Sequence, residues 1–346
     1  TLLPKKDLRY MLEDSQAKAV ICSEDLLTTF EELKKELDNK FIILTESKKA
    51  NLKISENIFN INAMFNTNND DTSYAKTYRN SECFWLYSSG STGKPKGTIH
   101  IHKSLINTSE TYAKNILRIE KNDIFFSAAK LFFAYGLGNA LTFPLSVGGT
   151  SVLSKERPSV ELITEIIKKY SVTIFFGVPT LYAAMLNTAI DKNNFKTLRI
   201  SVSAGEALPS HLSIKWKDIT NKNVLDGIGS TEMLHIFISN NIDEINHGAS
   251  GKPVKGYEAR LIKDNGELAG VNEIGELEVK GPTSAIMYWN KPDKTKVTFL
   301  KDWVRTGDKY TKNSHGVFTY CGRADDMMKV SGQYVSPFEI EAALQT

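Results

Sequence analysis

Apolar and polar positions along the chain follow two alternating periods. In residues 158–170, "PSVELITEIIKKY", apolar side chains recur at spacings of three and four, which predicts an amphipathic helix. Residues 172–178, "VTIFFGV", are nearly all apolar and predict a strand buried on both faces, after which Pro179 opens a further helix. Because this strand–helix rhythm begins near residue 8 and continues to about residue 250, we predict an α/β fold with a large N-terminal region of mainly parallel βα units.

Two stretches depart from this rhythm. Residues 46–80 are polar, rich in asparagine and without a clear period, and they predict a surface excursion. After about residue 250, short alternating segments such as "YEARLIK" and "IGELEVKG" are separated by turns such as "DNGE". This pattern predicts an antiparallel β subdomain at about 250–324, within a main domain that covers 1–324. Residues 325–346 are then expected to form a hinge and the start of a small mobile C-terminal domain.

The two ends of the chain predict a piece of a longer protein. The first residue is Thr1 rather than methionine, and the last segment, "FEIEAALQT", stops inside a helical pattern. We therefore expect both the main domain and the C-terminal domain to be truncated.

The composition limits the kinds of binding partner and the cellular compartment that we expect for this protein. The formal net charge of +3 is too small to predict a nucleic-acid or membrane partner. No apolar run approaches the roughly 18 residues of a membrane span. Cys22, Cys83 and Cys321 lie far apart without metal-ligand spacing, so we expect neither a metal site nor a disulfide framework, and we predict a cytoplasmic protein. His100 and His102 share one strand face without a third ligand nearby, and we interpret them as structural or as support for a substrate loop.

A glycine-rich stretch, "YSSGSTGKPKG" at residues 87–97, carries the first chemical signal. Glycines allow backbone N–H groups to approach phosphate oxygens, while hydroxyls and lysines add donors and positive charge. The stretch is not the phosphate loop of kinases and GTPases, because Lys94 is followed by Pro95 rather than by serine or threonine. The alternative for these residues alone is a flexible surface turn.

Three further clusters of small or acidic residues follow predicted strands. They are "SAGEALP" at 203–209, "DGIGSTEM" at 226–233 and "WVRTGDKY" at 303–310. In open α/β sheets, ligands bind beyond the carboxyl ends of the strands. We therefore predict that the four clusters together form a nucleotide site.

These segments resemble the motifs of the adenylate-forming superfamily, which contains acyl-CoA synthetases, peptide-synthetase adenylation domains and luciferases. "YSSGSTGKPKG" resembles its phosphate loop, "DGIGSTE" its second core motif, "VRTGD" its third and "GRADDMMKVSG" its hinge. Within the superfamily, three segments resemble benzoate–CoA ligases and their aryl-CoA ligase relatives. They are "KLFFAYGLGNALTFPLSVGG", "STEMLHIFISN" and "KVSGQYVSPFEIEAAL".

The resemblance implies ATP, Mg²⁺ and coenzyme A, and it assigns residues to them by motif. Thr231 would contact the α-phosphate, Glu232 would hold Mg²⁺, and with Lys94 they form the expected catalytic set; Glu232 as a plain surface carboxylate is the alternative. Asp308 would bind both ribose hydroxyls, or else be a turn aspartate, and Arg323 would reach the ribose or a phosphate. Asp226 would lie near the adenine amino group. The other nucleotide residues that it implies are Ser88, Ser89, Gly90, Ser91, Thr92, Gly93, Lys96, Gly97, Gly205, Glu206, Ala207, Gly227, Ile228, Gly229 and Ser230.

The resemblance also implies a pocket for the acid. Its walls would include Phe133, Ala134, Tyr135, Gly229 and His235. Aromatic walls suit a flat ring, because offset and edge-to-face contacts between rings are favourable. Core packing of Phe132, Phe133 and Tyr135, and a purely structural His235, are the alternatives.

For the second half-reaction, the resemblance implies a domain rotation at a hinge. Asp325 would be the hinge, with Lys329, Ser331, Gly332 and Tyr334 on the segment that moves in for thioester formation. The lysine that serves adenylation in the family lies near the end of its chains, beyond Thr346, so we expect the fragment alone to adenylate weakly.

We therefore predict an AMP-forming acid–thiol ligase that activates a benzoate-like acid and transfers the acyl group to coenzyme A. Three alternatives stay open: transfer to a carrier-protein phosphopantetheine, activation of a fatty or medium-chain acid, and a catalytically idle binding module. A homodimer also stays open.

Overall fold

The computed structural model describes residues 3–38, 40–46, 57–64, 73–90, 93–326, 328–330 and 333–335. They fall into two compact units. The first unit consists of Thr1–Thr77 and Tyr87–Gly97, and the second of Tyr78–Leu86 and Thr98–Thr346.

The first unit has a small parallel sheet with its own core. Strands β1 (Ala19–Ser23), β2 (Ile42–Glu46) and β3 (Ile58–Asn60) pair in parallel. Leu33 and Ile43 are fully buried at the centre of this core. Its other elements are α1 (Lys5–Ser15), η1 (Glu24–Leu26), α2 (Leu27–Glu36) and α3 (Ile61–Met64), and it takes in the end of β4 (Glu82–Gly90) and the start of β5 (Gly93–Ile101).

The second unit is built on a seven-stranded sheet in the order β12-β11-β10-β9-β8-β6-β7. The five strands from β10 to β7 are parallel, whereas β11 and β12 run antiparallel to their neighbours. The strands are β6 (Ile124–Ser127), β7 (Thr150–Val152), β8 (Ile174–Gly177), β9 (Ile200–Ser203), β10 (Val224–Gly229), β11 (Ile236–Ser239) and β12 (Lys252–Pro253).

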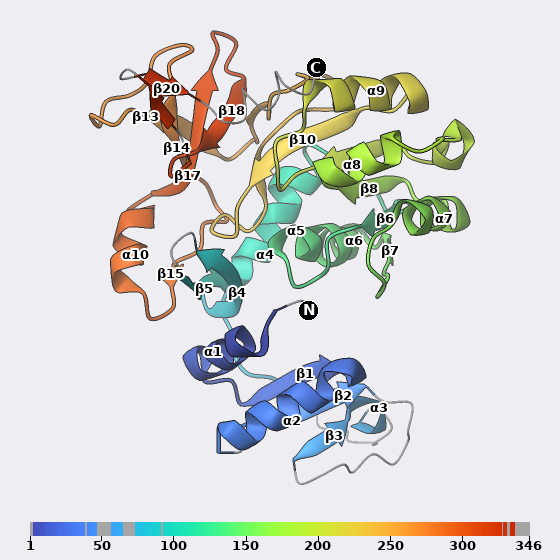
Figure 1. Ribbon diagram of the computed structural model, residues 1–346, viewed down its shortest axis with the longest axis vertical. Helices are drawn as coiled ribbons and strands as arrows, with labels where there is room; N and C mark the ends of the chain where they lie inside the picture. Colours follow the sequence, from blue (N-terminus) through green and yellow to red (C-terminus); the bar gives the residue numbers. More distant parts are fainter. Residues whose placement is uncertain are drawn as a thin grey trace. The chain divides into compact units, whose positions relative to one another are not determined.

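Both faces of this sheet are buried, as the continuous apolar run in β8 predicts. Phe176 packs into one core cluster and Phe175 into another, because successive side chains of a strand point to opposite faces. Helices α7 (Val160–Tyr170), α8 (Pro179–Leu186) and α9 (Ser210–Thr220) contribute to the second cluster and lie on one side of the sheet (Figure 1). Ser159 caps α7, its hydroxyl accepting a hydrogen bond from the Leu162 N–H at 3.2 Å. Elements that supply the first cluster or connect the strands are α4 (His102–Thr108), η2 (Ser109–Ala113), α5 (Ala134–Leu137), η3 (Gly138–Thr142), α6 (Phe143–Val147) and η4 (Lys192–Phe195).

An antiparallel sheet follows after residue 257, and with it the predicted α/β class with parallel and antiparallel sheets is confirmed. It is built from β13 (Glu258–Ile262), β14 (Gly275–Lys280), β16 (Phe299–Leu300), β17 (Trp303–Lys312) and β18 (Phe318–Arg323). Strand β15 (Met287–Tyr288) instead pairs with β5, and α10 (Pro292–Thr298) follows it. Strands β19 (Met328–Val330) and β20 (Gln333–Val335) pair with each other.

One expectation about an irregular segment is wrong, and the alternative of a flexible surface turn fails for most of the glycine-rich stretch. Residues 46–80 are not only a surface excursion, because Ile58 is 2% exposed and β3 completes the first sheet through its pairing with β2. The glycine-rich stretch is also more regular than a turn. Strand β4 extends to Gly90 and β5 begins at Gly93, so the strands include all of the stretch except Ser91 and Thr92, which lie outside the described residues.

Candidate active site

The turn after β10 is the centre of the predicted site. It is fixed by the Ser230 hydroxyl, which accepts the Met233 N–H at 3.2 Å, and by the Leu234 N–H, which donates to the Thr231 carbonyl at 3.2 Å. The buried His100 lies 2.8 Å from the same carbonyl through Nε2. Because a carbonyl only accepts, this nitrogen carries the proton. His100 therefore supports the backbone at Thr231, in agreement with its structural interpretation.

Burial also fixes the charge of His100. It lowers the pKa of His100 to about 4, although the Thr231 carbonyl and Glu232 act in the opposite direction. The imidazole is therefore neutral at pH 7. It stacks on Phe84 with 5.4 Å between ring centroids.

Glu232, the predicted metal ligand, is held at two points by a segment far along the chain. The Ala285 N–H donates to its backbone carbonyl at 2.8 Å, and the Tyr288 hydroxyl donates to its Oε1 at 2.5 Å. Burial and the nearby Glu232 raise the pKa of Tyr288 well above its ordinary value, so the hydroxyl keeps its proton. Tyr288 was not predicted from the sequence. It lies in the segment "MYWN", which is the only sequence feature that could have pointed to this residue.

Asp308 and Arg323, both predicted for the nucleotide, are directly opposite in the pairing of β17 with β18. Arg323 Nη1 donates to Asp308 Oδ1 at 3.0 Å and to the Thr306 carbonyl at 3.2 Å. Burial raises the pKa of Asp308 despite the opposing effect of Arg323. The predicted hinge residue Asp325 lies 3.5 Å from Arg323 Nε. Three predicted residues therefore form one charged group.

The residues that are predicted to contact adenine differ in their exposure to solvent. Gly205 and Glu206 are exposed just beyond β9, and Gly205 has a positive φ of 95°. Asp226 is only 5% exposed, and its Oδ1 has no partner among the described residues. Burial raises the pKa of Asp226 well above its ordinary value, against two backbone N–H groups that lower it. Its contact with adenine stays a prediction.

The residues predicted for the acid pocket lie around His235. The ring centroid of the predicted Tyr135 lies 5.6 Å from that of His235, and that of Phe143, which was not predicted, lies 4.7 Å from it. Ala134 begins α5 immediately before Tyr135, whose hydroxyl donates to the Gly177 carbonyl at 3.3 Å. A Cβ at Gly229 would lie 2.7 Å from the backbone carbonyl of His235, so a side chain there would collide with that backbone. The structure therefore brings these predicted residues together.

The alternative of core packing fails for two neighbouring aromatic residues. Phe132 and Phe133 are 58% and 56% exposed, and their rings contact each other with 4.6 Å between centroids. A role for Phe133 at the acid pocket stays a prediction.

His235 is neutral and has a defined tautomer. Asn139 Nδ2 donates to the Ser127 hydroxyl at 3.4 Å, and its Oδ1 lies 3.0 Å from His235 Nε2 and accepts a hydrogen bond from it. Burial lowers the pKa of His235 to about 3. Asn139, which was not predicted from the sequence, sets this arrangement.

Because Gly138 has no side chain, the imidazole of His235 can occupy the space beside it. A Cβ at Gly138 would lie 2.4 Å from His235 Cδ2 and 3.1 Å from Phe143 Cζ. We expect Gly138→Ala to displace the imidazole, to lower the free energy of unfolding by about 1–3 kcal/mol and to raise the KM for the acid. Urea unfolding and steady-state kinetics measure these effects. In the control Gly270→Ala, the new methyl group meets only the flexible end of Glu273, so equal losses in both variants would contradict the prediction.

The glycine-rich stretch belongs to the first unit. Lys94 Nζ lies over the Tyr10 ring, 5.0 Å from its centroid. Tyr87, which precedes Ser88, donates to Asp14 Oδ2 at 2.7 Å, and the Ser88 hydroxyl has no partner among the described residues. Thus α1 contacts the stretch at Tyr87 and at Lys94.

The remaining predicted residues of the hinge lie at the end of the described chain. Lys329 and Tyr334 are opposite each other in the β19–β20 pair, and Ser331 and Gly332 lie outside the described residues.

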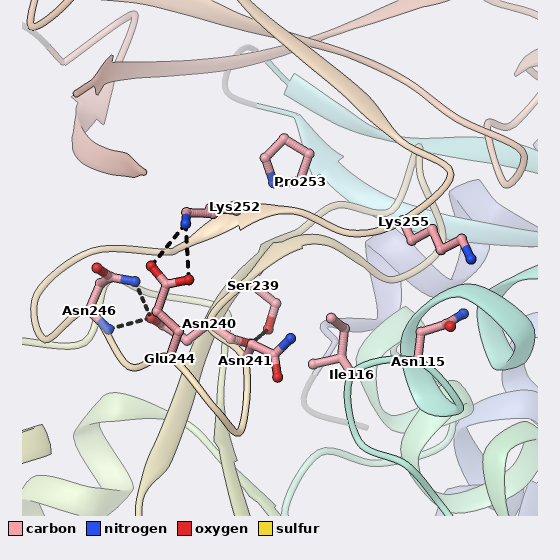
Figure 2. Close-up of a pocket in the computed structure, with 10 residues that line it drawn as sticks. All are labelled: Asn115, Ile116, Ser239, Asn240, Asn241, Glu244, Asn246, Lys252, Pro253 and Lys255. Carbon is pink, nitrogen blue, oxygen red and sulfur yellow. Dashed lines mark hydrogen bonds and ion pairs between the residues drawn. The ribbon is translucent and has the colours of Figure 1, made fainter. Parts of the chain in front are cut away.

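A cavity of about 380 Å³ adjoins the predicted residue Asp226, because its wall residue Asn240 donates its N–H to the Asp226 carbonyl at 2.9 Å. Figure 2 shows the ion pair that Lys252 makes with Glu244 at 2.9 Å and the Asn246 N–H that donates to Asn240 Oδ1 at 2.6 Å. The cavity adjoins Ser239, at the end of β11, whereas His235 precedes the start of that strand. None of the predicted site residues lines it. Its walls are Asn115, Ile116, Ser239, Asn240, Asn241, Glu244, Asn246, Lys252, Pro253 and Lys255.

No described helix is both long and apolar enough to cross a bilayer. The described residues also contain no group of three or more His, Cys, Asp or Glu side chains that would enclose a metal ion.

A seven-stranded, mainly parallel sheet with helices packed on it defines an α/β protein, and the residues predicted for a nucleotide follow the carboxyl ends of β9 and β10. The chain belongs to the AMP-binding enzyme family, which it matches over residues 1–289. It is 48% identical to the benzoate–CoA ligase of Thauera aromatica, over 99% of this chain and 64% of that protein. It therefore spans about 64% of the length of this relative.

Solved structures show the same fold. A benzoate CoA ligase from Burkholderia xenovorans LB400 is 43% identical with a TM-score of 0.91, over 99% of this chain and 67% of that one. An anthranilate CoA ligase in complex with anthranoyl-AMP is 37% identical with a TM-score of 0.94, over 99% of this chain and 66% of that one.

Proposed function

We propose that the protein is an AMP-forming acid–thiol ligase that activates a benzoate-like acid with ATP and passes the acyl group to coenzyme A. The observation that carries this proposal is the continuity of residues 226–235. This single segment holds the predicted phosphate and metal residues, Thr231 and Glu232, and then His235, whose ring lies beside those of Tyr135 and Phe143. A carboxylate bound beside His235 would therefore lie close to the α-phosphate. The similarity to CoA ligases of aromatic acids supports the proposal.

The reaction proposed for this site has two steps. A carboxylate oxygen of the acid attacks the α-phosphorus of ATP, so an acyl–phosphate bond forms and pyrophosphate leaves. The thiol of coenzyme A then attacks the acyl carbon and loses its proton, and AMP leaves. The first step brings like charges together, so the site must orient the reactants and neutralise charge. Thr231 and the lysines of the glycine-rich stretch are the donors that we assign to the phosphates.

Glu232 fits a magnesium ion. Mg²⁺ is usually held by one or two carboxylates together with substrate phosphates and water rather than by a protein cage. A single carboxylate on a well-fixed turn meets this requirement, and the described residues offer no larger ligand group. When bound, the ion would neutralise phosphate charge.

Asp308 and Arg323 suit the ribose. A carboxylate accepts several hydrogen bonds, and the rigid β17–β18 pairing fixes its direction. Arg323 keeps this buried carboxylate paired before the nucleotide binds. Tyr135 and the neutral His235 would contact the flat ring of the acid, which requires no buried charge at that position.

We also infer a cytoplasmic location, because Cys22, Cys83 and Cys321 are free thiols, as in proteins of reducing compartments.

A panel of acids tests the proposal. The full-length protein receives ATP, Mg²⁺ and coenzyme A with benzoate, 4-hydroxybenzoate, 2-aminobenzoate, cyclohexanecarboxylate, acetate or octanoate, and mass spectrometry detects acyl-CoA and acyl-AMP. We expect thioesters from the flat aromatic acids. Turnover of octanoate or acetate instead would overturn the substrate class while keeping the adenylation chemistry. An adenylate without a thioester would move the acceptor to a carrier protein.

A further inference from the structure

Glu232 is oriented by a segment that the nucleotide motifs do not include. Residues 285–288 contact it twice, with the Ala285 N–H on its backbone carbonyl and the Tyr288 hydroxyl on its carboxylate. One contact fixes the main chain and the other fixes the side chain. The Thr283 hydroxyl adds a third bond to the same turn, to the Met233 carbonyl at 2.7 Å.

Tyr288 is itself well fixed. It is 2% exposed and meets Phe299 edge-on with 5.2 Å between ring centroids. Its N–H donates to the Thr295 hydroxyl at 3.1 Å, and its backbone pairs with Thr98 in β5. A hydroxyl on such a framework has few alternative positions, so the carboxylate that accepts its hydrogen bond is restricted as well.

The hydrogen bond is of the strong type. A phenol that donates to an ionised carboxylate makes a charge-assisted bond, and the 2.5 Å separation of the two oxygens is in the range of such bonds. A carboxylate has lone pairs on both oxygens, so one donor does not prevent it from binding a metal ion. Partners of this kind orient metal ligands, and losing one typically weakens metal binding about 10–100-fold.

We propose that Tyr288 is a positioning residue for Glu232, holding the carboxylate in the orientation that binds the metal–nucleotide complex. This inference rests on the proposed function, because it assumes that Glu232 meets Mg²⁺ and ATP. Tyr288 itself touches no reacting atom in this proposal and acts through Glu232.

The test removes one oxygen atom from the full-length protein. Tyr288→Phe keeps the ring against Phe299 and loses only the hydroxyl. Mn²⁺ binding is measured by electron paramagnetic resonance with α,β-methylene-ATP, which cannot release pyrophosphate. We expect the Kd for Mn²⁺ to rise about 10-fold. In the adenylation assay, the Mg²⁺ concentration for half-maximal rate should rise by a similar factor, with kcat at saturating Mg²⁺ nearly unchanged.

The matched control is Tyr182→Phe. Tyr182 is also fully buried, and its hydroxyl donates to the Val202 carbonyl at 2.9 Å, within the core cluster that contains α7, α8 and α9. Tyr182→Phe should lower the melting temperature to a similar extent without changing the Kd for Mn²⁺. Equal weakening of metal binding in the two variants would overturn the positioning role, since it would reflect a general loss of stability.

A double variant separates positioning from other effects. In a Glu232→Gln background, Tyr288→Phe should add no further loss of Mn²⁺ binding, because the carboxylate that it orients is gone. A further 10-fold loss there would overturn the inference. If the wild-type protein makes no adenylate with any acid, the proposed function is wrong. The Mn²⁺ measurement still tests whether Tyr288 orients Glu232. An active wild type with unchanged Mn²⁺ binding in Tyr288→Phe would overturn only this inference.

Discussion

Glu232→Gln is expected to lower the rate of pyrophosphate release by about 100-fold at saturating acid. Glutamine keeps the shape of the side chain and an oxygen that accepts the Tyr288 hydroxyl, and the Ala285 bond involves only the backbone. What is lost is the negative charge that would hold Mg²⁺ against the phosphates. Metal stabilisation of charge in such transition states contributes several kcal/mol. A loss of about 3 kcal/mol corresponds to roughly 100-fold in rate.

The measurement is pyrophosphate release in the full-length protein over a range of Mg²⁺ concentrations. Glu258→Gln is the control for charge removal, because Glu258 is 65% exposed and pairs only with Lys280 among the ion pairs of the described residues. We expect the control to behave as wild type. An unchanged rate in Glu232→Gln would make Glu232 a plain surface carboxylate and remove the metal site from the proposal.

The fold was predictable because the spacing of apolar residues is a local property. Ile163, Ile166 and Ile167 in α7 are buried, as their spacing predicts. The apolar run of β8 is buried on both faces. Strand β3 was missed because it has only three residues, which is too short to display a period among polar neighbours.

The candidate site was predictable only where its chemistry lies within a continuous motif. Thr231 and Glu232 are adjacent in sequence, and the motif names both. Glu232 and Tyr288 are 56 residues apart, and His235 and Asn139 are 96 residues apart. Neither contact leaves a periodic signal, because which side chains meet depends on the packing of whole elements. The positioning residues therefore emerged only from the structure.

The composition of the glycine-rich stretch also did not indicate its regular structure. Serine, threonine and lysine suggested a loop, although Trp85 and Ile99 on either side are typical of strands. In the structure, β4 and β5 continue into the stretch and are neighbours in one sheet with β15. Local composition therefore did not show how far the flanking strands continue into the stretch.

The buried pair of Asp123 and Arg199 provides the largest expected effect on stability. Asp123 Oδ1 accepts from Arg199 Nε at 2.7 Å and from the Thr173 hydroxyl at 2.8 Å, and its Oδ2 accepts from the Glu120 N–H at 2.8 Å. The Asp123 side chain is 5% exposed and that of Arg199 is 35% exposed. Arg199 also donates to the Leu117 carbonyl at 3.1 Å, so the pair joins segments that adjoin β6, β8 and β9.

Asp123→Asn places an NH₂ group against donors and leaves Arg199 without its counter-charge. Breaking a buried ion pair costs about 3–5 kcal/mol, and because Arg199 is partly exposed we expect about 3 kcal/mol. Urea unfolding of the full-length protein measures this loss. The control is Asp243→Asn, whose ion pair with Arg118 has side chains that are 66% and 52% exposed. Such a pair contributes less than about 1 kcal/mol, so equal losses in the two variants would contradict the prediction.

The pH dependence gives this prediction a second check. Burial alone would raise the pKa of Asp123, but Arg199, the Glu120 N–H and Thr173 outweigh it and hold the pKa below the ordinary 3.8. The unfolded chain therefore binds the proton first as the pH falls. The contribution of Asp123 is fully present above pH 3.8 and is lost as the pH falls through the lower value of the folded state. The difference in stability between wild type and Asp123→Asn should therefore be constant near neutral pH and shrink below about pH 4. A difference that stays the same down to pH 3 would mean that the loss in Asp123→Asn arises from altered packing rather than from the missing charge.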